Sequence, residues 1–444
     1  MRLVALLWCA AAAFAADPQG SGPLPLSLKQ AVTIATSEEG NTNIRLAGEA
    51  LVQTRDQSLE ARSALLPNLD SSINYEDLTR NLAAMGFSLK LPIAIPGLVI
   101  PTFVGPFQTL DFRATASQSV FDFSSIRRYQ SSKVGITAAK AQVESTAEQV
   151  AGQVARAYLA AVRADADVES AQANVQLSQA LLDQAQHLKA AGTGTGIEVT
   201  RARVQLADDR QRLLDVENDR RSAHLRLLRA MGMRLDVDLQ LTDPLRYTPV
   251  DAVTLDEART SALKERPDYT AQRQREDVAR LSASATKMER LPSVAAFGDY
   301  GTIGTGTSSL LPTRTVGVSI KVPIFDGGRR DARRAESASQ YRAEQTRTKD
   351  LKQQIELDVR LALDELRSAE EQVKVAQDGL ALAHDEMTQA RRRYEAGVAV
   401  SLEVTDSQTR LAKAQDNLTA ALYKYNVARV DLAQSMGKIR SMVQ

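Results

Sequence analysis

The sequence AGTGTGIEVT, at residues 191–200, returns late in the chain as AGVAVSLEVT, at residues 396–405. The offset between the two copies is 205 residues (396 − 191 = 205). Met231-Gly232 returns as Met436-Gly437 at the same offset (436 − 231 = 205). This period is far longer than the 20–50 residues of solenoid repeats. The chain therefore contains a duplicated structural unit.

Each copy of this glycine-bearing turn follows a long stretch in which apolar positions fall alternately four and three residues apart. Such heptad spacing is typical of long helices that pack lengthwise. Adding 205 to each position of the first series gives a second series, in which the apolar character is kept except at Ser178 and Lys189 and in part at Tyr394. The two series are Val150, Val154, Ala157, Ala161, Ala164, Val168, Ala171, Val175, Ser178, Leu182, Ala185 and Lys189, and Ile355, Val359, Ala362, Leu366, Ala369, Val373, Ala376, Leu380, Ala383, Met387, Ala390 and Tyr394.

The pattern predicts two long helices, at about 125–190 and about 328–396. Residues 125–190 contain no proline, and a helix of 66 residues (190 − 125 + 1) would extend roughly 100 Å. A shorter amphipathic helix follows each turn, at about 197–231 and about 402–436. Each half of the chain therefore contains a long antiparallel helical hairpin.

Alternating residues between the helices predict strands. Pro67 and Pro292 end the first helix of each half, because proline lacks a backbone donor and restricts the residue before it. Apolar and polar residues then alternate, which is typical of a sheet with one apolar face. The predicted strands cover about 69–79, 110–122, 293–303 and 314–324. Each is about 10 residues long, which suits a tilted strand that crosses a bilayer.

Four strands are too few to close a membrane barrel, for which the minimum is about eight. An open sheet cannot lie in lipid, because its edge groups would lack hydrogen bonds. If these strands enter a membrane, the protein must therefore form oligomers. Two chains would supply eight strands and three chains would supply twelve, and only the larger number leaves a wide lumen.

The connection between the first two strands, about residues 80–109, is apolar and contains four prolines. This composition predicts an ordered outer loop, for which both surface docking and a partial lid stay open.

The first residues have the pattern of a secretory signal. Arg2 precedes an apolar stretch, and Ala13-Phe14-Ala15 predicts cleavage before Ala16. Cys9 lies within the apolar stretch after Trp8 rather than after a small residue, so we do not expect it to carry a lipid anchor. Removal of residues 1–15 lowers the net charge from +1 to 0 (1 − 1), which gives no reason to expect a nucleic-acid partner.

Catalytic and metal-binding patterns are absent from the sequence. The three histidines, His187, His224 and His384, are far apart, and no cysteine follows the predicted signal. The glycine-rich run at 192–196 lacks the lysine of a phosphate-binding loop and follows a helix instead of a strand. We expect a protein that is not an enzyme and that uses no cofactor or metal.

The duplicated order of helix, two strands, long helix and hairpin helix resembles the TolC-type outer membrane efflux proteins over nearly the whole mature chain. The most specific local match is VPIFDGGR at residues 322–329, with a looser copy, VFDFS, at 120–124. A second match is YEAG at 394–397, followed by Leu402-Glu403-Val404 and Asp406.

This resemblance implies an α+β homotrimer in the cell outer membrane. Twelve strands would form a transmembrane β-barrel, and twelve helices would continue it as an α-barrel across the periplasm. The implied function is a passive exit duct that contacts outer membrane lipid, a periplasmic adaptor protein and an inner-membrane transporter. The alternatives are a structural periplasmic coiled coil and an adaptor, which would carry only one hairpin.

The resemblance also implies roles for residues at the hairpin tips. Glu403 and Asp406 match an acidic ring at the periplasmic aperture, and Tyr394 and Glu198 match a pair that closes the tip. Ala399 departs from the pattern, because the family's best-known member has a basic residue there. The residues that match the adaptor-docking turns are Ala191, Gly192, Thr193, Ala396, Gly397 and Val398.

The predicted organisation follows from these elements. A signal at 1–15 and a linker at 16–27 precede the first repeat at 28–231. An equatorial connection at 232–254 leads to the second repeat at 255–436, and a tail covers 437–444.

Overall fold

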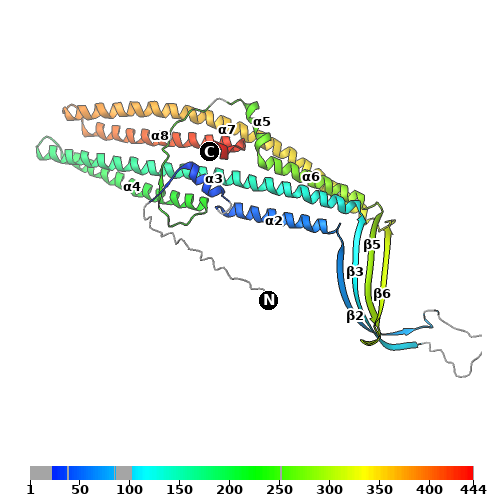
Figure 1. The fold of residues 1–444 in the computed structure, drawn as a ribbon. Coiled ribbons are helices and arrows are strands. Elements are labelled where there is room, and N and C mark those ends of the chain that lie inside the picture. The colour runs from blue at the N-terminus through cyan, green and yellow to red at the C-terminus, as the bar shows by residue number, and fades with distance from the viewer. Residues whose placement is uncertain (1–22, 38–39, 85, 87–102, 251–252, 444) are drawn as a thin grey trace, which may run out of the picture. The chain divides into compact units, whose positions relative to one another are not determined.

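The computed structural model describes residues 23–37, 40–84, 86, 103–250 and 253–443 (Figure 1). The predicted signal peptide and most of the proline-rich connection lie outside these residues. The chain forms two compact units, and each unit takes segments from both sequence repeats. The first unit contains residues up to Thr42, Glu148–Leu255 and the residues from Arg360 onward, and the second contains Asn43–Ala147 and Asp256–Val359.

The second unit contains a four-stranded antiparallel sheet with the order β2-β3-β5-β6. Its strands are β2 (Asn68–Asn81), β3 (Phe103–Phe121), β5 (Ser293–Gly304) and β6 (Leu311–Lys321). Leu69 pairs with Ala116, which in turn pairs with Gly298, and Gly298 pairs with Val316. Because paired residues face the same side of a sheet, the apolar positions of the strands share one face.

Helices of the second unit meet the sheet at one end (Figure 1). They are α2 (Thr42–Ser63), α5 (Leu255–Glu265), α6 (Pro267–Met288) and the first parts of α3 (Phe123–Ala190) and α7 (Arg329–Glu395). Both α2 and α6 end a few residues before the prolines Pro67 and Pro292, and the strands begin directly after those prolines. Pro67 and Pro292 thus mark the change from helix to strand.

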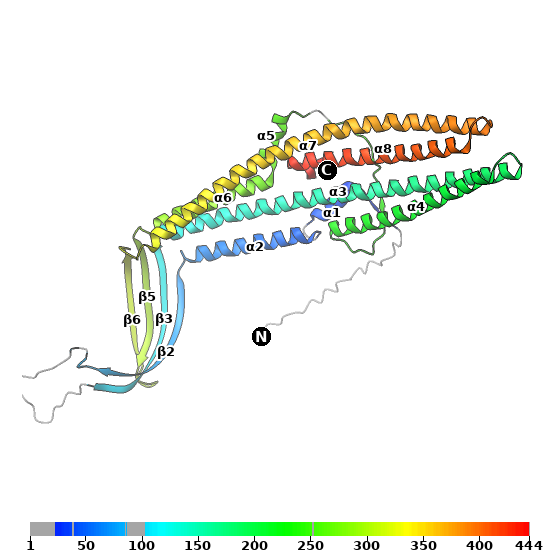
Figure 2. The same cartoon turned by 180° about the vertical axis from the view of Figure 1, so that it is seen from behind.

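The first unit contains the ends of α3 and α7 with their hairpin partners α4 (Gly196–Met231) and α8 (Ser401–Ser435) (Figure 2). It also contains β1 (Leu24–Leu26), α1 (Leu28–Thr36), β4 (Leu239–Leu241) and α9 (Ile439–Val443). Across the two units, every residue of the two predicted heptad series is buried or partly buried except Lys189. The heptad spacing therefore identified the packed side of both long helices.

The structure corrects several strand boundaries, including the start of β6, which lies at Leu311 instead of about 314. Strand β3 begins at Phe103 instead of about 110, so seven residues of the predicted loop belong to this strand (110 − 103 = 7). Strand β6 ends at Lys321 instead of 324, although the alternation continues through Val322 and Ile324. Pro323 lies between these two residues and cannot donate a hydrogen bond to a neighbouring strand, which explains why the pairing stops.

Other differences concern short elements. Strands β1 and β4 pair in parallel, and both lie in segments that we predicted as linker and connection. The first helix of each half is divided, into α1 and α2 and into α5 and α6. Pro267 begins α6, where a missing backbone donor costs nothing, so it starts a new helix after the break.

Tyr158 of α3 attaches the N-terminal strand to the first unit. Its hydroxyl lies 3.0 Å from the Leu26 carbonyl and 2.9 Å from the Asp243 carboxylate, so its single proton is shared between these two acceptors. The same carboxylate accepts from the Leu28 backbone N–H at 2.6 Å. The Tyr158 side chain is fully buried, and this burial raises its pKa. The hydroxyl is therefore a hydrogen-bond donor at physiological pH.

Replacing Tyr158 by phenylalanine should lower the free energy of unfolding by about 1.5 kcal/mol, because the carbonyl of the buried Leu26 and the charged Asp243 carboxylate lose their donor. Urea denaturation of the detergent-solubilised protein, followed by circular dichroism, measures this change. Tyr423→Phe is the control: its ring packs 5.2 Å from the Arg163 guanidinium, and its hydroxyl has no hydrogen bond within the described residues. Equal stability of the two variants would contradict the role of Tyr158.

Candidate functional site

The two hairpin turns have the same backbone geometry. Gly192 and Gly397 have φ angles of 75° and 72°, in the left-handed region that favours glycine. In the first turn the Thr193 N–H donates to the Leu188 carbonyl at 3.0 Å, and in the second the Val398 N–H donates to the Arg393 carbonyl at 3.0 Å. These bonds form a Schellman motif, which satisfies the last carbonyls of each long helix. The repeated glycines thus end both helices in the same way.

The six residues predicted to dock an adaptor all lie at these turns and are exposed. They are Ala191, Gly192, Thr193, Ala396, Gly397 and Val398. Small side chains surround both turns, so a partner can approach the backbone closely. Their exposure is compatible with docking, and the docking role stays a prediction.

Glu403 and Asp406, the predicted aperture acids, both form ion pairs within their own hairpin. Glu403 accepts from the Arg393 guanidinium at 3.0 Å. Asp406 accepts from Arg410 at 2.7 Å, and Arg410 also contacts Glu386 at 2.9 Å. We predicted that these acids form a negative ring, and we did not predict their arginine partners. The nearby arginines reduce the negative potential that the acids alone would produce.

Tyr394 and Glu198 come from different hairpins, on α7 and α4. Burial, and after it the negative charge of Glu198, raise the pKa of Tyr394 above its ordinary value. The structure thus brings this predicted pair close enough for an electrostatic effect. Glu198 has a second role, because its carboxylate accepts from the Thr195 N–H at 2.8 Å in a capping box that begins α4.

A buried polar contact that we did not predict joins the hairpins near these tips. Gln408 of α8 donates to the Ser178 hydroxyl at 2.7 Å, and Ser178 donates to the Asp209 carboxylate of α4. Both Ser178 and Gln408 are buried. Ser178 is the polar exception in the heptad series, so the sequence contained a signal for this contact. A buried hydrogen-bonded polar residue in such a series fixes the register of neighbouring helices.

The sheet of the second unit has two contrasting faces. Its apolar face is open to the surroundings in the single chain: Val316 is 85% exposed and Leu69 is 77% exposed. On the opposite face Arg113 lies between Asp111 and Asp299, each at 3.0 Å. Within the described part of one chain, the edge strands β2 and β6 each pair on one side only. An exposed apolar face, a polar face and two open edges are what a segment of a transmembrane barrel requires.

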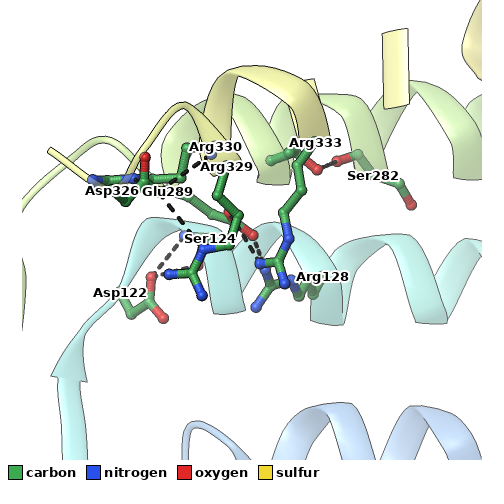
Figure 3. A network of polar contacts seen from close by, with 10 residues as sticks. Asp122, Ser124, Arg128, Ser282, Glu289, Asp326, Arg329, Arg330 and Arg333 are labelled. Atoms are coloured by element: carbon green, nitrogen blue, oxygen red, sulfur yellow. Dashed lines mark hydrogen bonds and ion pairs between the residues drawn. The ribbon is translucent and has the colours of Figure 1, made fainter. Parts of the chain in front are cut away.

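Asp122 and Asp326 join the sheet to the long helices. The Asp122 carboxylate accepts from the Ser124 N–H at 2.9 Å and from the Ser125 hydroxyl at 2.5 Å. Asp326 accepts from the Arg330 backbone at 3.2 Å and from its guanidinium at 2.7 Å. Carboxylates at these positions satisfy the free N–H groups at a helix start. The repeated Phe-Asp pairs of the sequence are therefore the starts of α3 and α7 (Figure 3).

Two further properties bear on function. No helix among the described residues is apolar over a stretch long enough to cross a bilayer. In the same residues, no group of histidine, cysteine, aspartate and glutamate side chains could hold a metal ion.

The sequence profile of the outer membrane efflux proteins matches residues 34–233 and 258–438, which is most of the chain. The chain belongs to this family. The resemblance to TolC-type proteins is thereby confirmed, and so is the outer-membrane location. The alternatives of an adaptor or a structural coiled coil are set aside, because this family consists of outer-membrane channel proteins.

Similarity to individual relatives agrees with the family. The chain is 25% identical to the alkaline protease secretion protein AprF of Pseudomonas aeruginosa, over 70% of this chain and 66% of that protein. The matched region therefore spans slightly less than two thirds of the length of AprF. It is 22% identical to the outer membrane protein TolC of Vibrio cholerae, over 87% of this chain and 86% of TolC.

Solved structures show the same fold. The Campylobacter jejuni outer membrane channel CmeC superposes with a TM-score of 0.79 and 16% identity, covering 93% of this chain and 85% of CmeC. The Vibrio cholerae outer membrane protein VceC superposes with a TM-score of 0.77 and 17% identity, covering 93% and 96%. The combination of strands and long helical hairpins in this chain is therefore the fold of outer-membrane channels.

Asp122→Ala should lower the free energy of unfolding by about 1 kcal/mol at pH 7, because the start of α3 loses its cap. Burial opposes ionisation of Asp122, but hydrogen bonds from Ser125 and Ser124 outweigh burial and lower its pKa. A lowered pKa stabilises the fold above the unfolded pKa of about 3.9, and this stabilisation is lost as the pH falls through the folded value. The difference from wild type should therefore shrink below about pH 4. Denaturation at several pH values measures it, and a difference that grew towards acid would contradict this account.

Arg410→Gln should strengthen the binding of divalent cations at the hairpin tip, because Asp406 and Glu386 lose a cationic neighbour. The change should be about fivefold at most, since exposed ion pairs contribute up to about 1 kcal/mol. Block of single-channel current by Mg²⁺ in planar bilayers measures it. Arg367→Gln is the control, because it removes an arginine of α7 that lies far from the tip. Arg367 is 26 residues before Arg393 of the tip (393 − 367), and its acidic partner Asp364 lies 4.0 Å away. An equal change in both variants would refute the local effect.

Proposed function

We propose that three copies of this chain assemble into a passive exit duct in the outer membrane. The observation that carries the proposal is the sheet of the second unit, with its exposed apolar face, its polar face and its two open edges. Three such sheets would supply twelve strands, with the edge β2 of one copy paired to the edge β6 of the next. The apolar faces would contact lipid, and the polar faces would line the lumen.

The polar face has the chemistry of a solvated pore wall. Arg113, Asp111 and Asp299 place both charge signs on it. The ring of Phe297 lies against Gly317 on the same face, where any larger residue would clash with the ring. Fixed charges of both signs favour a wet passage without strong selection for one class of ion.

The hairpins would continue the passage into the periplasm. Twelve helices, four from each copy, would form its wall, and the exposed glycine turns would contact a periplasmic adaptor. An inner-membrane transporter linked through that adaptor would supply the energy. Within each chain, the contact between Gln408, Ser178 and Asp209 would hold the two hairpins in register.

Closure of the passage would take place at the tips. Tyr394 and Glu198 would hold the two hairpins of one chain together, and the ion pairs of Glu403 and Asp406 would keep the second hairpin rigid. Opening would require these side chains to separate. The paired acids predict a tip that is less attractive to cations than an unpaired acidic ring.

The test combines assembly with conductance. Purified wild-type protein should behave as a trimer in detergent by cross-linking and should form stable pores in planar bilayers. Tyr394→Ala should increase the time that the pore spends open, because the tip loses a contact between its hairpins. Tyr341→Ala is the control, since it changes a partly exposed tyrosine of α7 that lies 53 residues before the tip (394 − 341). A monomer that is stable in buffer without detergent, or a protein that forms no pores, would overturn the proposal.

A further inference from the structure

Arginines gather where the helices of the second unit meet the sheet. The segments 122–128, 287–290 and 326–334 contain eight basic and four acidic residues, a net charge of +4. The whole chain has a net charge of only +1, so the rest of the chain is net negative. Arg330 of these segments is held by the Asp326 carboxylate at 2.7 Å. We call the other six arginines of these segments, which are exposed or partly exposed, the arginine belt: Arg127, Arg128, Arg290, Arg329, Arg333 and Arg334.

Two members of the arginine belt are fixed in place by one carboxylate. Glu289, directly after α6, contacts Arg128 of α3 and also Arg333 of α7 at 3.7 Å (Figure 3). The Glu289 side chain is largely buried, whereas those of Arg128 and Arg333 are more than half exposed. One negative charge shared by two guanidinium groups leaves a net positive charge and several free N–H donors. Such donors suit a bidentate contact with a phosphate group.

Three other members of the arginine belt have weak or no acidic partners, whereas Arg290 pairs with the Asp331 carboxylate. Arg329 lies 3.8 Å from Asp326 and is 70% exposed, and the same carboxylate already accepts a closer bond from Arg330. Arg127 donates to the neutral side chain of Gln130 at 2.8 Å. Arg334 is exposed and makes no ion pair with the described residues. The arginine belt therefore has positive charge that the chain itself does not neutralise.

Exposed apolar side chains lie beside these charges. Ile324 and Phe325, directly before Asp326, are 93% and 86% exposed. Phe121 and Phe123 flank Asp122, and their rings meet edge to face with centroids 5.1 Å apart. Aromatic and aliphatic groups beside arginines are typical of the boundary between acyl chains and headgroups.

We propose that the arginine belt binds the phosphate groups of anionic phospholipids in the periplasmic leaflet of the outer membrane. The inference rests on the proposed function, because it requires the sheet to lie in that membrane. The belt segments come directly after the end of β3, just before the start of β5 and shortly after the end of β6, at the end of the sheet that carries the helices. That end faces the periplasm, where phospholipids form the leaflet, whereas lipopolysaccharide lies at the opposite end of the strands. Two acyl chains would pack on Phe325 and Ile324 while the headgroup contacts the arginines.

Native mass spectrometry of the full-length protein in detergent tests this inference. Wild type should retain phosphatidylglycerol in preference to phosphatidylethanolamine, and 0.5 M salt should reduce the preference by screening. Arg329→Gln/Arg334→Gln should weaken retention of phosphatidylglycerol about tenfold, because each arginine near a membrane surface contributes noticeably to anionic-lipid binding. Millimolar inorganic phosphate should not displace the lipid, since it lacks the acyl chains.

Two further variants keep the test clear of folding effects. The first is the triple variant Arg128→Gln/Arg333→Gln/Glu289→Gln. It removes both arginines and the carboxylate that they share, so that no buried charge loses its partner. This variant should also weaken retention of phosphatidylglycerol. Arg273→Gln/Arg342→Gln is the matched control. It removes two exposed arginines from α6 and α7 that lie at least eight residues farther from the sheet than the belt (342 − 334 = 8), and it should bind lipid as wild type does.

The outcomes separate this inference from the proposed function. Pores of normal conductance with no preference for phosphatidylglycerol would overturn the lipid site and leave the duct. Equal loss of lipid in the belt and control variants would also overturn it, since charge alone would then explain binding. Retention of lipopolysaccharide instead of phosphatidylglycerol would refute the assignment to the periplasmic leaflet. Absence of pores from wild type would overturn the proposed function itself.

Discussion

A hydrogen-bonding constraint governs this molecule. Backbone N–H and C=O groups have no water to bind in the interior of a bilayer, so a sheet there must have no free edge. Within the described residues, one chain supplies four strands to this sheet and leaves the outer edges of β2 and β6 open. Its apolar face is exposed at the same time, which would be costly in water. If copies join edge to edge in the membrane, the edge strands gain hydrogen-bond partners and the apolar face contacts lipid instead of water.

The helical hairpins face a different problem, because long helices with small apolar residues can slide past one another. Alanines such as Ala161 and Ala369 are fully buried and bring the helices close, but they specify little about register. The polar contact of Ser178 with Gln408 supplies that specificity, because a shift of one turn would leave both groups buried without partners. This contact therefore opposes sliding of one hairpin along the other.

Much of this architecture could be predicted from the sequence, because it depends on periods that extend over many residues. The heptad series located the packed faces of the long helices, and the alternation located the sheet. Short elements were missed, since the three residues of β1 and of β4 show no period and pair across 215 positions of sequence (239 − 24). At the tips, the pair of Arg410 and Asp406 has helical i, i+4 spacing and was accessible to sequence reasoning. The pair of Arg393 and Glu403 crosses the turn, so it required the folded hairpin.

The N-terminal strand also constrains how the protein is made. Leu26 belongs to a strand whose partner is about 215 positions later, and Ile439 of α9 is fully buried and donates to the Glu148 carboxylate at 3.2 Å. The first unit therefore cannot complete its core until nearly the entire polypeptide has emerged from the translocation machinery. Such distant contacts make folding slow and leave apolar surface uncovered in the meantime. Biogenesis of this protein should consequently depend on chaperones that hold the chain after secretion and before insertion.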